Sequence, residues 1–218
     1  EMCIRDRLHR SVSVASGRRC VVQRTVSITT VLMAELYSER FELALTTALE
    51  AHGLRERKAG RGFEVSHVMS VALITADFNL EEDTVIAALL HDTLEDTDLA
   101  TKIIASRFGL HVLEMVQDVT EPPKGVPWHD RKTRYIEQLQ STPRHGSLAI
   151  ASADKIHNLS RMTAGIGEQG LSFINAFTAD VEDMSWYHQS VLKTLSSRWN
   201  HAILDAHRRE LDLSLIHI

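Results

Sequence analysis

The chain has 218 residues, 44% of them hydrophobic, and a formal net charge of −5. This length suits a single domain with looser ends, and the apolar content is too high for a disordered chain. The apolar runs are all shorter than the roughly 20 residues that a membrane-spanning helix needs, and a net negative charge disfavours nucleic-acid binding. We therefore expect a soluble protein with neither a membrane nor a nucleic acid as partner.

Residues 1–32 differ from the rest of the chain, because they are rich in Arg, Ser, Thr and Val and show no helical periodicity. Both cysteines, Cys3 and Cys20, lie there. The remainder can form neither a disulfide nor a thiolate metal site, which fits a reducing cytoplasm. We interpret residues 1–32 as a non-native or disordered leader, with an organelle transit peptide as the alternative. The domain is expected over residues 33–212, followed by a non-native tail at 213–218.

From Met33 onwards the hydrophobic pattern has helical periodicity. The expected helices of the first half cover residues 34–52, 67–77, 79–93, 102–108 and 111–120. Ser66 is a plausible N-cap for the second of these helices. Acidic residues near the start of the third helix favour a helix N-terminus there.

The second half of the chain continues the helical pattern. Its expected helices cover residues 128–140, 147–162 and 176–210. The Pro and Gly content of residues 121–127 and 165–170 predicts loops. No stretch alternates polar and apolar residues as a half-buried strand would. The predicted fold class is all-α.

The segment Ala87–Asp98 (AALLHDTLEDTD) ends an apolar helix with a group of polar residues. Asp92, Glu95 and Asp96 stand at positions i, i+3 and i+4 and therefore share a helix face. Three carboxylates on one face repel each other unless a cation neutralises them. His91 beside Asp92 offers the mixed nitrogen and oxygen ligation that suits a first-row divalent metal. The alternative interpretation is an ordinary helix end with solvated acids.

Two further segments carry polar residues in positions that favour a site. Asp154 and Asn158 stand at i and i+4 in a helix that is otherwise apolar, where an unpaired charge would be very costly. His67 follows the basic pair Arg57 and Lys58, which could stack on a base or hold a phosphate. The alternatives are a surface histidine at a helix start and solvated surface charges.

The order of these motifs resembles the HD-domain superfamily, and more narrowly the hydrolase domain of RelA/SpoT-type proteins and the stand-alone small alarmone hydrolases. The similarity covers roughly residues 48–162 and includes the sequences HDTLEDTD, PWHDRKTRY and ADKIHN. It implies a single HD-domain helical bundle with a metal site in its core. The family's reaction removes pyrophosphate from the 3′ position of guanosine tetra- or pentaphosphate, which is a small-molecule nucleotide substrate.

The resemblance also implies roles for individual residues. The expected ligands of one Mn²⁺-like ion are His67, His91, Asp92 and Asp154. The residues expected to orient or deprotonate the attacking water are Glu95 and Asp96. The expected substrate-binding residues are Arg57, Lys58, Asn158 (near the nucleotide ribose) and Lys155. Arg131 and Lys132 could also meet the polyphosphate, but we interpret them as solvated charges of a helix surface, and His157 as a structural histidine beside the site.

The segment around His67 departs from the alarmone hydrolases, which usually carry Pro-Tyr just before this histidine and Pro just after it. Here the corresponding residues are Phe63-Glu64 and Val68, so the metal site carries over better than the guanine specificity. Two alternatives to alarmone hydrolysis follow. One is hydrolysis of another nucleotide or phosphate ester at the same metal site, and the other is a non-catalytic HD nucleotide-sensing module.

Overall fold

The structure is a computed structural model, and it describes residues 37–58, 62–123 and 125–217. Over these residues the chain forms α1 Glu39–His52, α2 Glu64–Asp77, α3 Glu82–Leu90, α4 Thr93–Asp96, α5 Thr101–Phe108, α6 Leu110–Val119, α7 Trp128–Ser141, α8 His145–Gln169, the 3-10 helix η1 Gly170–Ala176, α9 Val181–Arg198 and α10 Ala202–His217. Apart from one isolated bridge between Glu56 and Phe63, the described residues make no strand pairing. The all-α prediction is confirmed. None of the described helices is long and apolar enough to cross a membrane.

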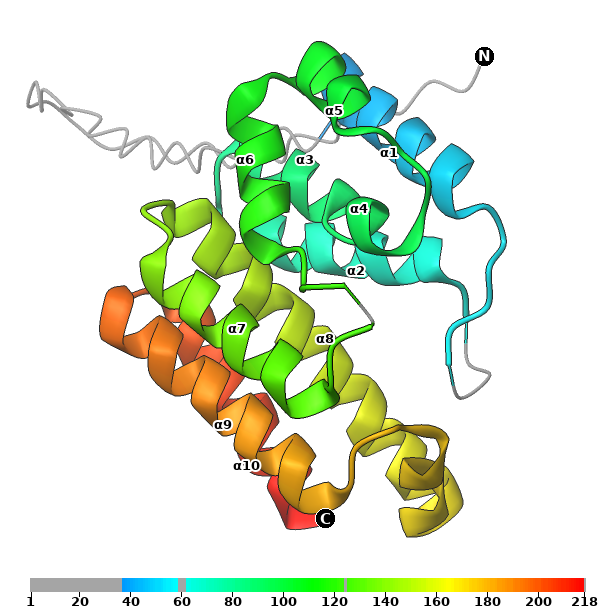
Figure 1. Cartoon of the computed structure of the whole chain (residues 1–218), viewed down its shortest axis with the longest axis vertical. Coiled ribbons are helices and arrows are strands. Elements are labelled where there is room, and N and C mark those ends of the chain that lie inside the picture. Colours follow the sequence, from blue (N-terminus) through cyan, green and yellow to red (C-terminus); the bar gives the residue numbers. More distant parts are fainter. Residues whose placement is uncertain (1–36, 59–61, 124, 218) are drawn as a thin grey trace, which may run out of the picture. The chain divides into compact units, whose positions relative to one another are not determined.

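The 25-residue helix α8 joins two groups of helices (Figure 1). It contacts α2, α3 and α6 of the first group, and α9, α10 and η1 of the second. α7 packs against α9 and also contacts α6. Because α8 touches both groups, its side chains can meet residues that lie far away in the sequence.

α3 is enclosed by its neighbours. All residues from Thr84 to Leu90 are buried, and α1, α2, α6 and α8 surround them. A helix that is apolar on all sides is expected to lie in a core. The residue that follows the helix, His91, is only 3% exposed. The apolar helix therefore delivers a histidine into the interior of the molecule.

Asp118 near the end of α6 holds the start of α8. One of its carboxylate oxygens, Oδ2, accepts hydrogen bonds from Thr142 Oγ1 at 2.5 Å and from Ser147 Oγ at 2.7 Å. Arg144 Nη1 lies 2.8 Å from the same oxygen. Hydrogen bonds to a charged acceptor are stronger than neutral ones. This connection fixes α8, which carries Asp154, against the first group of helices.

The predicted start of the second helix is wrong by three residues. α2 begins at Glu64, because Ser66 does not act as its N-cap but takes part in its first turn. The Ser66 hydroxyl donates to the Phe63 carbonyl at 2.6 Å, and the Phe63 amide donates to Ser66 Oγ at 3.2 Å. His67 consequently lies inside the helix rather than at its first position.

The third predicted helix, over residues 79–93, is in fact shorter. α3 covers Glu82–Leu90, and the Thr93 hydroxyl donates to the Leu90 carbonyl at 2.6 Å. The short helix α4 starts at Thr93, and the Asp96 amide donates to the Asp92 carbonyl at 2.9 Å. The spacing from Asp92 to Asp96 therefore stays helical across the turn.

The loop predicted at residues 165–170 is also wrong, since α8 continues to Gln169. Gly165 is buried within this helix, and a Cβ atom there would lie 2.5 Å from the ring of Phe173. Here glycine permits close packing between α8 and η1 rather than a turn.

The last predicted helix, 176–210, is two helices with an interruption. Trp199 has extended backbone angles (φ −152°, ψ 152°). Its ring stacks on His201 at 4.3 Å and on His145 at 5.3 Å between centroids. The contact with the neighbouring His201 and the contact with the distant His145 together hold the bend between α9 and α10.

The predicted leader, residues 1–32, lies outside the described residues. The predicted tail begins at residue 213, and α10 continues as a helix through residue 217 with Ser214 fully buried. Helical structure does not test the origin of these residues, so the domain boundaries stay predictions.

Candidate metal centre

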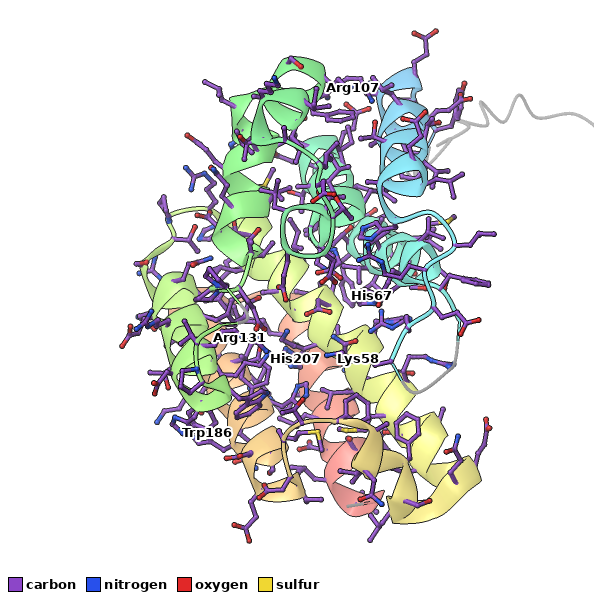
Figure 2. The ribbon with its side chains drawn as sticks, turned by 45° about the vertical axis from the view of Figure 1, so that its right-hand side comes forward. Lys58, His67, Arg107, Arg131, Trp186 and His207 are labelled. Carbon is purple, nitrogen blue, oxygen red and sulfur yellow. The ribbon has the colours of Figure 1, made fainter. Side chains whose placement is uncertain are left out.

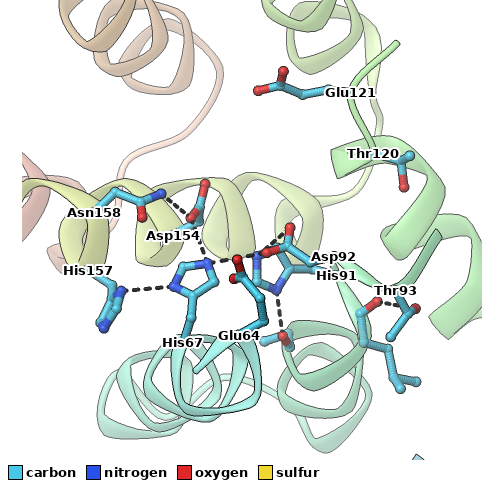
Figure 3. Close-up of polar contacts among 12 residues, drawn as sticks. Glu64, His67, His91, Asp92, Thr93, Thr120, Glu121, Asp154, His157 and Asn158 are labelled. Atoms are coloured by element: carbon cyan, nitrogen blue, oxygen red, sulfur yellow. Dashed lines mark hydrogen bonds and ion pairs between the residues drawn. The ribbon is translucent and has the colours of Figure 1, made fainter. Parts of the chain in front are cut away.

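Four side chains meet where α2, the end of α3 and the middle of α8 come together (Figure 3). His67 lies on α2, His91 and Asp92 follow α3 directly, and Asp154 lies on α8. His67 Nε2 is 3.4 Å from Asp92 Oδ2 and 3.2 Å from Asp154 Oδ1. One donor atom each of His67, His91 and Asp92 lies within 4.8 Å of the others. The four predicted ligands, which are far apart in the sequence, are thus brought together.

His91 has one ring nitrogen in use and the other directed to the site. Nδ1 lies 2.8 Å from the carbonyl oxygen of Ala88, which can only accept, so Nδ1 carries a proton. In a neutral imidazole the other nitrogen is then an acceptor. Nε2 lies 3.1 Å from Asp92 Oδ1 and, among the described residues, has no hydrogen-bond partner although it is buried. A buried lone pair without a partner is costly, and a metal cation at this point would remove that cost.

His67 is oriented by a second histidine. Its Nδ1 is 2.8 Å from His157 Nδ1, so one of the two nitrogens must donate. Burial, assisted by the neighbouring His67 and Arg57, lowers the pKa of His157 to about 4, and His157 is therefore neutral and able to accept. His67 then donates from Nδ1, which directs its Nε2 to the carboxylates. Histidine ligands of metals are commonly held by a hydrogen bond from the second nitrogen in this way.

Asp154 is held by Lys155 and Asn158, and Arg57 acts on it through Asn158. Lys155 Nζ donates to Asp154 Oδ2 at 2.6 Å, and Asn158 Nδ2 donates to Oδ1 at 2.5 Å. Arg57 Nη2 donates in turn to Asn158 Oδ1 at 3.0 Å. The predicted substrate-binding residues Arg57, Asn158 and Lys155 therefore also fix the position of this carboxylate.

The charges around the site favour ionised carboxylates. Burial by itself raises the pKa of Asp154, but Lys155 and His67 outweigh it and hold that pKa well below its usual range. Burial also raises the pKa of Asp92, and His91 and His67 bring it below its usual range. Burial lowers the pKa of His67, yet its hydrogen bonds to Asp154 and Asp92 raise it overall. The two carboxylates thus attract positive charge to the space between them, and either a proton or a divalent cation could provide it.

A cavity of about 570 Å³ opens beside these residues. Its volume lies in the range of roughly 300–1,000 Å³ that is typical of small-molecule sites. Glu95 and Asp96 line it together with His67, Asp92 and Asp154. The wall also includes the four predicted substrate-binding residues Arg57, Lys58, Asn158 and Lys155, and Figure 2 labels Lys58 and His67. Apolar side chains line another part of the wall, namely Met162, Phe173, Phe177, Ala179 and Met184.

The interpretation of Arg131 and Lys132 as solvated surface charges is wrong. Their side chains are only 16% and 13% exposed, and both line the cavity. Their partner is Glu121, a residue that the sequence did not single out. Glu121 lies in the connection between α6 and α7, where no periodic pattern could have predicted its direction.

Two more residues of the site were not assigned to it from the sequence. Glu64 lines the cavity, its carboxylate is 3.6 Å from Arg57 Nη1, and burial raises its pKa. His157 contacts His67 directly. A signal existed for each, because Glu64 precedes His67 by three residues and His157 follows Asp154 by three, and residues at this spacing are neighbours on a helix.

These residues can together hold a divalent cation beside a polar cavity. Two imidazole nitrogens and two carboxylates form the donor set, which suits Mn²⁺, Fe²⁺ or Zn²⁺ better than the all-oxygen set typical of Mg²⁺ and Ca²⁺. The orphaned Nε2 of His91 and the lowered carboxylate pKa values agree with such an ion. The acids Glu95 and Asp96 lie at the same cavity, where they could accept a proton.

Comparison with known proteins gives a consistent result. The family model described as HD domain matches residues 44–170. A guanosine-3′,5′-bis(diphosphate) 3′-pyrophosphohydrolase of Aquifex aeolicus (strain VF5) is 42% identical over 124 residues, which are 56% of this chain and 18% of the relative. The bifunctional (p)ppGpp synthase/hydrolase SpoT of Escherichia coli (strain K12) is 30% identical over 126 residues, again 56% of this chain and 18% of the relative. The chain thus spans under a fifth of the length of these two relatives.

Two solved structures resemble the chain over most of their own length. One, of a metazoan ortholog of SpoT described as hydrolyzing ppGpp, has a TM-score of 0.66 and 26% identity, and the match covers 80% of this chain and 94% of that one. The other, a crystal structure of a Listeria monocytogenes EGD-e protein, has a TM-score of 0.61 and 29% identity, and the match covers 67% of this chain and 96% of that one.

Proposed function

Because this chain belongs to the HD domain family, whose model matches more than half of it, we propose that it is a metal-dependent phosphohydrolase that removes pyrophosphate from the 3′ position of guanosine tetra- or pentaphosphate. The observation that carries the proposal is the meeting of His67, His91, Asp92 and Asp154 beside a cavity. Three of these four residues line the cavity together with Glu95 and Asp96. The similarity to the Aquifex pyrophosphohydrolase and to the metazoan ppGpp hydrolase supports this substrate class.

We assign one divalent ion, Mn²⁺, to the four side chains His67, His91, Asp92 and Asp154. The unpartnered, buried Nε2 of His91 and the fixed orientation of His67 support this assignment. When bound, such an ion lowers the pKa of a coordinated water from 15.7 to as low as about 7 and polarises a phosphoryl oxygen.

Glu95 and Asp96 are assigned the proton transfer from the attacking water. The water oxygen forms a bond to the phosphorus that carries the ribose 3′ oxygen, and the bond between that phosphorus and the 3′ oxygen breaks. The water proton passes to one of the two carboxylates, and the 3′ oxygen takes up a proton to become a hydroxyl. General-base catalysis of this kind is typically worth about 10² to 10⁴ in rate.

The remaining cavity residues are assigned to substrate binding. We assign Arg57 and Lys58 to contact with the base or a phosphate and Asn158 to contact with the ribose, and all three line the cavity. The apolar side chains of the cavity wall can cover the uncharged part of the nucleoside, because apolar lining with a few polar groups is the usual composition of such sites.

The proposal is tested with the full chain loaded with Mn²⁺ and given guanosine tetraphosphate. We expect release of pyrophosphate, which EDTA stops. Asp92→Ala and Asp154→Ala should each abolish metal binding measured by calorimetry, whereas Glu95→Gln should keep the metal and lose about 10² to 10⁴ in rate. Asp98→Asn, which removes an exposed carboxylate of the same segment, serves as the control. It should keep both the metal binding and the rate of hydrolysis of the parent.

Other nucleotide polyphosphates and phosphate monoesters are assayed in parallel. A metal-loaded protein that turns over one of these but not the alarmone would refute the alarmone as substrate and keep the phosphohydrolase. Turnover of none of them would favour a nucleotide-sensing module. A fully active Glu95→Gln variant would show that the role assigned to Glu95 is wrong.

A further inference from the structure

Two cationic side chains lie over the ring of Tyr187 on α9, and a third cation lies beside one of them on α7. Lys132 Nζ lies 4.4 Å from the ring centroid and Lys155 Nζ lies 5.1 Å from it, while Arg131 precedes Lys132 on α7. All four residues line the cavity beside the candidate metal centre, and Figure 2 labels Arg131 on α7. We call Arg131, Lys132 and Lys155 the basic cluster.

The basic cluster brings like charges close together where the side chains are poorly exposed to solvent. Lys132 and Lys155 are 13% and 6% exposed, and burial together with Lys155 and Arg131 lowers the pKa of Lys132 despite the opposing effect of Glu121. Buried cations are stable only when anions pair with them. Two carboxylates do so here, with Asp154 next to Lys155 and Glu121 next to the other two cations.

The Glu121 carboxylate faces three partners but does not complete the hydrogen bonding of all of them. Its Oε1 accepts from Lys132 Nζ at 2.5 Å and from the Tyr187 hydroxyl at 3.2 Å. Its Oε2 lies 3.2 Å from Arg131 Nε. Glu121 Oε2 and Arg131 Nε are nevertheless both buried and, within the described ranges, make no hydrogen bond. Buried polar atoms left unsatisfied in a native structure call for an explanation.

The position of Glu121 allows it to be replaced by another anion. It lies two residues beyond the end of α6, in the connection to α7, so its side chain can turn away without unfolding a helix. In the view of Figure 3 it lies on the opposite side of Asp154 from His67, and it points to the space above Asp154. An anion that displaced it would lie next to the candidate metal centre.

We propose that the basic cluster is the subsite for the pyrophosphate group and that Glu121 is its resident anion, which the pyrophosphate displaces. This inference rests on the proposed function and deepens it, because it names the residues that bind the pyrophosphoryl group that is transferred to water. Pyrophosphate oxygens would supply the hydrogen bond that Arg131 Nε lacks and would pair with Lys132 and Lys155. Glu121 in turn offsets part of the positive charge of the basic cluster when no phosphate is bound, and it weakens the binding of every phosphate by competing for the same cations.

The test is the binding of inorganic pyrophosphate to the full, Mn²⁺-loaded chain, measured by calorimetry at a fixed free metal concentration. Glu121→Gln removes the competing charge and keeps the shape, so we expect affinity for pyrophosphate to rise about tenfold, equivalent to about 1.4 kcal/mol. Lys132→Met removes a cation of the cluster and should lower the affinity about tenfold. Arg134→Met removes an exposed cation of the same helix and should leave the affinity unchanged, although it changes the net charge equally.

A Glu121→Gln variant that binds pyrophosphate no better than the parent, or more weakly, would overturn the proposal, because Glu121 would then position the cations instead of competing for them. An equal loss in Lys132→Met and Arg134→Met would also overturn it, because the effect would be one of net charge alone. Should Lys132→Met fail to fold, the Glu121→Gln result decides. A chain that shows the expected order of affinities but does not hydrolyse the alarmone would refute the proposed function and leave this subsite standing.

Discussion

Replacing His157 by phenylalanine tests whether this residue positions His67 for metal binding. A metal on Nε2 of His67 requires the proton of the ring to lie on Nδ1, where His157 Nδ1 accepts it at 2.8 Å. In the His157→Phe variant that N–H would be buried without an acceptor, because His67 is only 2% exposed. At a pH above the raised pKa of His67, the metal-free protein avoids this cost, because its neutral His67 can keep the proton on Nε2 and donate to Asp92 or Asp154.

The cost of a buried, unsatisfied donor is about 1–3 kcal/mol, and it falls on the metal-bound form alone. This corresponds to a loss of metal affinity of roughly 5- to 150-fold, which agrees with the roughly 10- to 100-fold typical of residues that orient a metal ligand. The assay is calorimetric titration of the metal-free full chain with Mn²⁺, followed by the rise in melting temperature at a fixed excess of metal.

His157→Gln provides the conservative variant, because its amide oxygen can accept the same hydrogen bond, and it should recover most of the affinity. His129→Phe is the matched control, because His129 stacks on Trp186 at 4.2 Å, and it should bind Mn²⁺ like the parent. Unchanged Mn²⁺ affinity in a folded His157→Phe variant would refute the reasoning.

Two further predictions concern stability and are checked by chemical denaturation in EDTA. Gly165→Ala should lower the free energy of unfolding by about 1–3 kcal/mol, because the new Cβ would lie 2.5 Å from the Phe173 ring. Gly167→Ala on the same helix has open space around the new Cβ and should raise the free energy of unfolding by about 0.5–1 kcal/mol. Equal effects of the two substitutions would show that close packing at Gly165 is not the cause. Burial lowers the pKa of His207 to about 4. Below about pH 6.5 the unfolded chain therefore binds a proton at His207 that the folded chain does not bind. Between pH 8 and pH 5 this difference should lower the free energy of unfolding by about 2 kcal/mol. His207→Phe should remove that part of the pH dependence, whereas replacement of the exposed His111 by asparagine should not, and identical pH curves for the parent and His207→Phe would contradict the assignment.

The sequence allowed predictions for the residues that follow short-range rules. The apolar helix before His91, the spacing of Asp92, Glu95 and Asp96, and the lone Asp154 in an apolar helix are local patterns, and their chemistry could be read without coordinates. The helical class followed from the same periodicity. The predicted helix boundaries failed where a contact between distant segments overrides local preference, as at Gly165 against Phe173 and at Trp199 between His145 and His201.

Residues on connections could not be predicted in this way, because the direction of a loop side chain follows no period. Glu121 is such a residue. The sequence also could not tell that Arg131 and Lys132 face inwards, since an amphipathic helix rich in charge normally turns its charged face to water. The structure turns this face towards Glu121 and Tyr187 instead.

The sequence by itself determined the helical class, and through the resemblance of its motifs to a known family it predicted four donor residues and two acids. Only the tertiary structure decided that these motifs meet, through α8 passing between the two groups of helices. It also decided which nitrogen of each histidine faces the carboxylates, because that choice depends on the partners Ala88 and His157. The physical reason is that donor chemistry belongs to a residue, whereas proton position and charge pairing depend on neighbours that folding brings together.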